Sequence, residues 1–207
     1  MTNKKIDINQ RIPLDTLYAV LESYLDDNYS DEYIIEQLRL HFDGENRLKK
    51  SLRIVKKIVS NNPLSDFILS NKEQVKVAIK KKTDRNLILI ALLSSSFVFS
   101  YDVISILGKL FKVQNAVNRE ALTREASRIY GGNRALPNAI DSVIPMYLEA
   151  ELFTRPQPGL YQWESGLTAT TEITKQIYYE SFKVVNSTDE VLDFHLSDPY
   201  FLFVEGL

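Results

Sequence analysis

Hydrophobic residues recur at intervals of three and four along the first third of the chain, the pattern of helices with one buried face. The first such segment covers residues 14–25. Ser30 is a good N-cap residue and is expected to begin a second helix that runs to Gly44. A third apolar face covers residues 48–59 and is ended by the break at Pro63. The pattern therefore predicts three consecutive amphipathic helices.

Three further helices are expected before residue 115, which makes six in that part of the chain. They follow a short turn over residues 64–69. Asn71 is expected to cap the fourth helix and Thr83 the fifth, because both side chains can accept a hydrogen bond from a free backbone N–H. Ser100 is expected to begin the sixth.

The fifth helix contains the most apolar part of the chain, residues 87–101. These fifteen residues carry no charge, but a membrane span needs about 20. Asp84 and Asp102 lie just outside them, and three consecutive serines lie in the middle. We therefore expect a buried core helix and no membrane partner.

The second half of the chain has a different order of elements. A helix over residues 118–130 precedes a glycine turn at 131–133, and a second helix is expected from about 134 to 153. Pro145 should kink or divide that helix, because proline removes a backbone donor. The Pro-Gly pair at 158–159, between two short extended pieces, predicts a β-hairpin.

The C-terminal part is expected to add one more helix and a packed tail. Thr170 or Thr171 is the expected cap of that helix, and the apolar tail 198–204 should pack against the body. The predicted fold is all-α, mainly helical, with a small β-hairpin wing. Its predicted division is a helical bundle over 1–115 and a winged helix-turn-helix with C-terminal helix and tail over 116–207.

Helix, glycine turn, helix and hairpin form the order of a winged helix-turn-helix, whose second helix can enter the major groove of double-stranded DNA. Arginine and asparagine are the residue types that read guanine and adenine edges. The candidate base-reading residues are Asn133, Arg134, Asn138 and Ser142. The supporting polar and cationic residues are Lys109, Lys112, Arg119, Arg124, Arg128, Arg155 and Gln157.

Charge is unevenly distributed, although the net charge is only −2. Residues 1–45 carry four Lys/Arg against ten Asp/Glu, residues 46–85 twelve against three, and residues 86–207 nine against fourteen. Cations on one surface could neutralise phosphates. Equally, they could be solvated or pair with the acidic first helices. The additional candidates for contacts with nucleic acid are Lys49, Lys50, Arg53, Lys56 and Lys57.

The sequence offers little for catalysis. It has no cysteine, and His41 and His195 lack the neighbours of a metal site. It also lacks the common phosphate-binding and hydrolase motifs. We therefore expect no enzymatic activity, no cofactor and no metal. The absence of cysteine and of a signal-peptide pattern leads us to expect a cytoplasmic protein.

The layout resembles that of the BrxA proteins of bacterial BREX phage-defence systems. The resemblance rests on a helical first half, the apolar helix at 87–101 and the predicted winged helix over 119–163, with Gly131-Gly132 followed by Leu136-Pro137 as the local likeness. It implies a small non-catalytic DNA-binding accessory protein that works with other proteins of a defence complex.

Two other functions fit the same pattern. An adaptor could use the winged helix and an exposed aromatic tail, Tyr200 to Phe203, to dock another protein. A transcriptional regulator would have the same elements, and a dimer that prefers palindromic sites would favour it.

Overall fold

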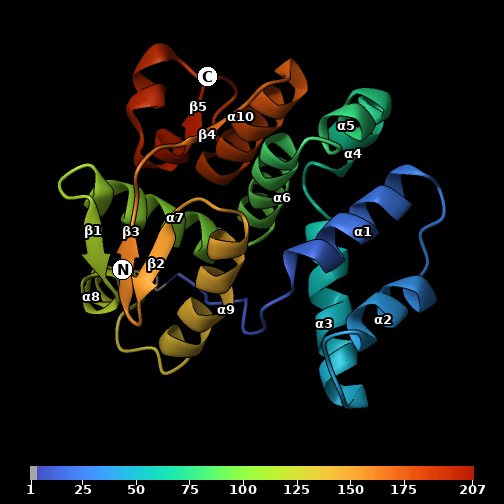
Figure 1. The fold of residues 1–207 in the computed structure, drawn as a ribbon, viewed down its shortest axis with the longest axis horizontal. Helices are drawn as coiled ribbons and strands as arrows, with labels where there is room; N and C mark the ends of the chain where they lie inside the picture. Colours follow the sequence, from blue (N-terminus) through green and yellow to red (C-terminus); the bar gives the residue numbers. More distant parts are fainter. Residues whose placement is uncertain (1–3) are drawn as a thin grey trace.

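The computed structural model describes residues 4–207 and is mainly helical, with a small sheet (Figure 1). The first helix ends where the sequence predicts, but the second ends before residue 44. The last residues expected in it form a turn. The N-terminal helices are α1 (Leu14–Leu25), α2 (Asp31–Arg39), α3 (Glu45–Ile58), α4 (Ser65–Ser70) and α5 (Lys72–Ala78).

The apolar stretch of the sequence is divided between two helices, α6 (Lys82–Ser96) and α7 (Val98–Phe111). Phe97 separates them with an extended backbone, φ −130° and ψ 101°. The prediction that Ser100 begins the second of these helices is therefore wrong. Most of α6 is buried, as expected for a core helix. Among residues 4–207, no helix is both long and apolar enough to cross a membrane.

A three-stranded antiparallel sheet lies next to the following helices. Its strands pair in the order β1-β3-β2, so β1 pairs with the second strand of the predicted hairpin, which becomes the central strand of the sheet. The elements follow in the order β1 (Ala116–Asn118), α8 (Arg119–Tyr130), α9 (Leu136–Glu149), β2 (Thr154–Gln157) and β3 (Leu160–Gln162). The hairpin is confirmed. The prediction did not include β1.

The C-terminal part packs back onto the central helices, as predicted. α10 (Glu172–Asn186) lies against α6, and the 3₁₀ helix η2 (Pro199–Phe203) lies against α7. The remaining elements are the 3₁₀ helix η1 (Asp193–Ser197) and a parallel pair of short strands, β4 (Leu167–Thr168) and β5 (Val204–Glu205). The tail is thus part of the core.

Helix caps account for several element boundaries. Ser30, Asn118 and Thr171 each accept a hydrogen bond from the backbone N–H three residues later, which confirms Ser30 and Thr171 as predicted caps. Asn71 does not cap α5: its amide donates to the carbonyl of Phe67 in α4. Most of the expected turn at residues 64–69 instead forms the short helix α4. The described chain thus has seven helices before residue 115.

One further boundary prediction is wrong, and of the two outcomes expected at Pro145, a kink or a division of the helix, the division does not occur. Thr83 lies inside α6, after the N-cap Lys81, and its hydroxyl is buried without a hydrogen-bond partner among the described residues. Pro145 does not divide α9, which continues on both sides of it. Burial of the neighbouring residues Ile144 and Met146 holds this stretch in place despite the missing N–H.

Buried Asp84 joins α6 to the start of α10. Its carboxylate accepts hydrogen bonds from the backbone N–H and hydroxyl groups of both Thr170 and Thr171. Burial opposes the charged form, but these hydrogen bonds outweigh it and hold the pKa of Asp84 below its ordinary value. The charge is therefore satisfied by dipoles and not by a cation.

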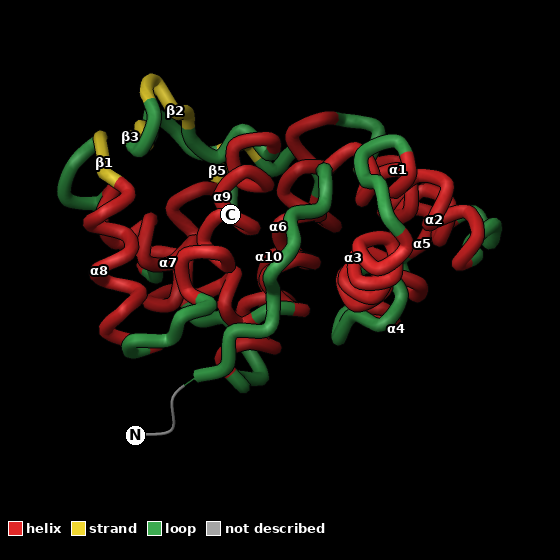
Figure 2. Tube along the Cα trace, turned by 90° about the horizontal axis from the view of Figure 1, so that it is seen from below, coloured by secondary structure: helices red, strands yellow, loops and turns green. Residues whose placement is uncertain are grey.

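The extended N-terminal segment crosses the middle of the molecule, between α3 on one side and α7 and α9 on the other (Figure 2). Two residues of the segment, Ile8 and Ile12, are fully buried. Its polar residues form ion pairs to both sides: Lys4 with Asp102, Asp7 with Lys57, and Arg11 with Glu149. The segment thus links the first helices of the chain to α7 and α9.

Candidate nucleic-acid interface

The hairpin tip and the start of α8 are adjacent. The backbone N–H of Arg119 donates to the carbonyl of Gly159 at 2.8 Å, and the Asn118 side chain caps α8 through Ala121 N–H at 2.7 Å. Gly159 has φ +77°, the left-handed conformation that glycine adopts without strain. This turn brings the exposed side of the hairpin to the N-terminal end of α8.

α9 has one buried face and one face open to solvent. Its buried face includes Ala139, Ile140 and Val143, which are fully buried. Asn138 and Asp141 lie on the open face. Because the helix presents its polar N-terminal half outward, that half is the part available to a partner.

Three of the four candidate base-reading residues lie at the exposed beginning of α9. Arg134 is exposed in the turn just before the helix, which starts two residues later than predicted. Asn138 is exposed in the first turn, and the exposed Asn133 accepts the backbone N–H of Ala135 at 2.9 Å. Ser142 lies in the interior at 5% exposure, and its hydroxyl donates to the Asn138 carbonyl.

Two arginines of α8 are already paired with carboxylates. Arg119 lies 2.7 Å from Asp141 of α9, and both side chains remain substantially exposed. Arg128 forms hydrogen bonds of 2.7 Å to both carboxylate oxygens of Glu125. The positive charge expected along α8 is therefore partly neutralised.

Three other arginines are exposed and have no carboxylate within ion-pair distance among residues 4–207: Arg124 of α8, Arg134 before α9, and Arg155 of β2. Gln157 is exposed on the same strand as Arg155. The structure thus places unpaired positive charge on each of the three elements around the start of α9.

A shallow hollow of about 430 Å³ lies over the outer sides of α8 and α9. Arg119, Arg124 and Pro137 line it together with Thr123 and Ser127. The two hydroxyls donate to backbone carbonyls of their own helix. Sequence reasoning did not select Thr123 or Ser127, although their spacing of four residues places them on one face.

The two lysines of α7 lie apart from this hollow. Lys112 donates to the carbonyl of Ser197 beside η1, and Lys109 lines a separate cavity with Arg128. They therefore belong to the side of α7 that carries the C-terminal segment.

Five of the twelve Lys/Arg residues in the basic segment 46–85 form ion pairs with the acidic start of the chain, which is one of the two interpretations that the sequence left open. Lys72, Lys76 and Lys80 form ion pairs with acidic residues of α1 and the turn after it. In α3, the ammonium of Lys56 pairs with the carboxylate of Asp31, and the hydrogen bond between them is the main cause that raises the pKa of Lys56.

The other candidate cations of α3 divide into two groups. Lys57 pairs with Asp7, and Lys50 donates to the carbonyl of Asn9. Lys49 and Arg53 are exposed and have no carboxylate within ion-pair distance in the described chain. Of the five α3 cations selected from the sequence, these two are therefore the ones available to a phosphate backbone.

The histidines have local structural roles. Nδ1 of His195 accepts the backbone N–H of Leu192 at 3.0 Å, and the His41 ring lies against Phe42. Among residues 4–207, no group of three or more His, Asp or Glu side chains is arranged to hold a metal ion.

The aromatic tail is not available for docking. Tyr200 and Phe203 are fully buried and Phe201 is 4% exposed. Burial also raises the pKa of the Tyr200 hydroxyl to about 12. The prediction of an exposed tail from Tyr200 to Phe203 is therefore wrong.

Comparison with known proteins gave no match to a protein-family model, to a curated protein or to a solved structure. The resemblance to the BrxA proteins stays a prediction from the sequence.

Proposed function

We propose that α7, β1, α8, α9 and the β2–β3 hairpin form a winged helix-turn-helix that binds double-stranded DNA. The proposal rests on one observation: α8, the turn before α9 and the hairpin each carry an exposed arginine without a carboxylate partner in the described chain. The first of these, Arg124, lines one hollow with Pro137 at the start of α9, and the hairpin tip is hydrogen-bonded to the start of α8. Helix, strand, two helices and hairpin, with strand order β1-β3-β2, is the arrangement that such a domain requires.

In the proposed complex, the N-terminal half of α9 enters the major groove. Arg134 and Asn138 then face base edges, where arginine fits guanine and asparagine fits adenine. Arg124 of α8 and Arg155 of the hairpin contact phosphates on either side of the groove. Ser142 has no part in this contact because it is buried.

The first helices contribute less in this proposal. Of the five α3 cations considered above, only Lys49 and Arg53 are both exposed and without a polar partner in the described chain. They would extend the phosphate contacts of a longer duplex without reading its sequence. The proposed activity is placement on DNA and involves no chemistry on it.

The test is equilibrium binding to a mixed-sequence duplex at several salt concentrations. The native protein is compared with a triple variant, Arg124→Ala, Arg134→Ala and Arg155→Ala. A charge-matched control carries Lys5→Ala, Lys81→Ala and Lys175→Ala, which remove three cations that lie outside the proposed interface and lack a carboxylate partner among the described residues.

The native protein should bind with an affinity that falls steeply with salt. Because each phosphate contact contributes about 0.9 to the slope of log K against log salt, the triple variant should lose up to about 1.8 through Arg124 and Arg155. The control should keep the native slope. Equal losses in both variants would refute the interface, and absence of binding at low salt would refute nucleic acid as the partner.

A further inference from the structure

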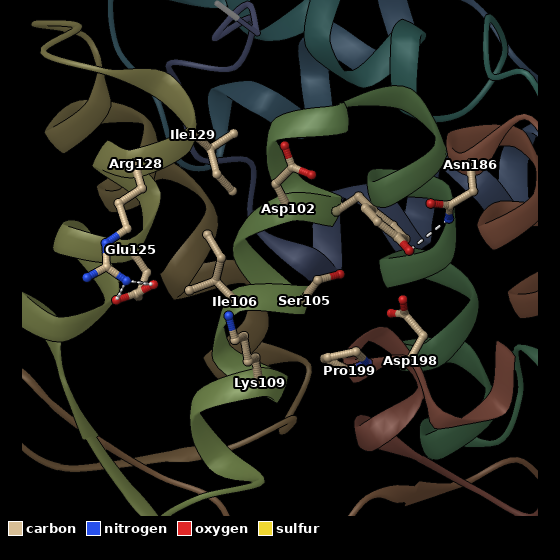
Figure 3. A pocket seen from close by; sticks show the side chains of 11 residues that line it. Asp102, Ser105, Ile106, Lys109, Glu125, Arg128, Ile129, Asn186, Asp198 and Pro199 are labelled. Carbon is tan, nitrogen blue, oxygen red and sulfur yellow. Dashed lines mark hydrogen bonds and ion pairs between the residues drawn. The ribbon is translucent and has the colours of Figure 1, made fainter. Parts of the chain in front are cut away.

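A cavity of about 450 Å³ lies between α7, α8 and the C-terminal segment, on a different side of α8 from the proposed DNA contact (Figure 3). Its volume falls within the range of small-molecule sites, about 300–1,000 Å³. Ile106 of α7 and Ile129 of α8 lie side by side in its centre and form an apolar floor.

One end of the cavity carries positive charge. Lys109 of α7 and Arg128 of α8 both line it, but Glu125 binds the guanidinium of Arg128 with two hydrogen bonds of 2.7 Å. Lys109 is exposed and has no carboxylate within ion-pair distance among residues 4–207. Its ammonium is therefore the cation available to a ligand at this end.

The other end carries a carboxylate. Oδ1 of Asp198 accepts the backbone N–H of Tyr200 at 2.8 Å, and no Lys or Arg of the described chain lies within ion-pair distance of this residue. Asp102, which also lines the cavity, already has partners for its carboxylate. Lys4 and the hydroxyl of Tyr130 already bind it, at 2.9 and 2.6 Å. Asp198 is therefore the anion available to a ligand.

The fold holds the cavity wall in place. Pro199 packs so closely on α7 that a Cβ atom at Gly108 would lie 2.1 Å from the Pro199 carbonyl oxygen. The residue after Asp198 is thus fixed against the helix that carries Lys109. The two charges face the cavity from preformed elements, which reduces the cost of ordering them on binding.

We propose that this cavity binds a small zwitterion of the ω-amino-acid type, whose ammonium and carboxylate are separated by a short apolar chain. The ligand's carboxylate lies at Lys109, its ammonium lies at Asp198, and its apolar chain lies on Ile106 and Ile129. The opposite charges at the two ends distinguish this ligand from a simple anion, which only Lys109 would attract, and from an apolar molecule, which would leave both charges unpaired.

The test is saturation-transfer NMR of the full-length protein with a series of straight-chain ω-amino acids of increasing length, followed by titration of the tightest one. Two derivatives serve as matched probes: the N-acetyl form has no ammonium and the amide has no carboxylate. Both should bind at least fivefold more weakly than the free amino acid. No DNA is needed, so the result is independent of the proposed function.

Two variants test the ends separately. Lys109→Gln should weaken binding at least fivefold, and so should Asp198→Asn, which keeps the oxygen that accepts the Tyr200 N–H. Lys175→Gln and Asp189→Asn, which do not line the cavity, should leave binding unchanged. Thermal unfolding of each variant checks that the fold is intact.

The proposal is overturned by any of three results: no amino acid binds, the two derivatives bind as tightly as the free amino acid, or both folded end variants keep the native affinity. Binding of the N-acetyl form alone would indicate an anion site at Lys109 and would also overturn the zwitterion proposal.

Discussion

Replacing Asp141 by asparagine should strengthen DNA binding. Asp141 is the acidic residue on the open face of α9, its side chain is 58% exposed, and it lies 2.7 Å from Arg119. The substitution removes a negative charge from the helix proposed to enter the groove. It also frees Arg119, which lines the hollow between α8 and α9, for a phosphate.

The expected magnitude follows from counterion release. One additional phosphate contact contributes about 0.9 to the salt slope, which corresponds to about an eightfold gain in affinity at 0.1 M salt relative to 1 M. The protein's stability should change little, because exposed ion pairs contribute about 0–1 kcal/mol.

Fluorescence anisotropy of a labelled duplex, over a series of salt concentrations, measures both the affinity and the slope. The matched control is Glu172→Gln, which neutralises an exposed carboxylate at the start of α10. A gain for the α9 variant alone supports the account. Weaker binding by the Asp141→Asn variant, or an equal gain in the control, would refute the reasoning about Arg119.

Three further predictions concern stability, each measured by urea unfolding. Asp84→Asn should lose about 2 kcal/mol, because the hydrogen bonds that Thr170 and Thr171 donate to a carboxylate become weaker bonds to a neutral side chain. Since the folded pKa of Asp84 is lowered, its contribution is full above the unfolded pKa of about 3.9 and is lost as the pH falls through the folded value; equal acid sensitivity of both proteins would contradict this. Gly108→Ala should cost about 2 kcal/mol or more through the clash with Pro199, and an unchanged midpoint would show that the tail yields. Gly159→Ala should cost about 1 kcal/mol because φ is +77° with open space around it, and a larger loss would mean that the turn is more constrained.

The sequence predicted elements whose signals are local. The apolar spacing over residues 14–25 identified α1, and Thr171 was one of two residues proposed to cap α10. The hairpin was predicted from the Pro-Gly pair at 158–159. In each case, neighbouring residues determine the conformation.

Other elements depend on contacts that sequence patterns do not contain. Strand β1 has only three residues and exists through its pairing with β3. The break at Phe97 follows three serines but has no glycine or proline, and Phe97 itself is not a capping residue type, so the local sequence marks the break only weakly. Thr83 was a reasonable cap by type, but the helix begins one residue before it.

The sequence predicted the residue types of the candidate site better than it predicted which of these residues are free to bind a partner. The sequence identified Arg119 and Arg128 as cations, but their pairing with Asp141 and Glu125 depends on how α8 and α9 are placed. Ser142 has the correct residue type, yet lies on the buried side of α9. Residue type alone therefore selected more candidates than the surface offers.

The most direct test of the central claim is amide hydrogen exchange, measured by mass spectrometry with and without a mixed-sequence duplex at low salt. The account predicts that DNA slows exchange in the segments around the exposed start of α9 and in the hairpin, residues 131–141 and 154–162, and leaves α1 and α10 unchanged. Protection confined to α1 through α5, with none in α9 or the hairpin, would contradict it.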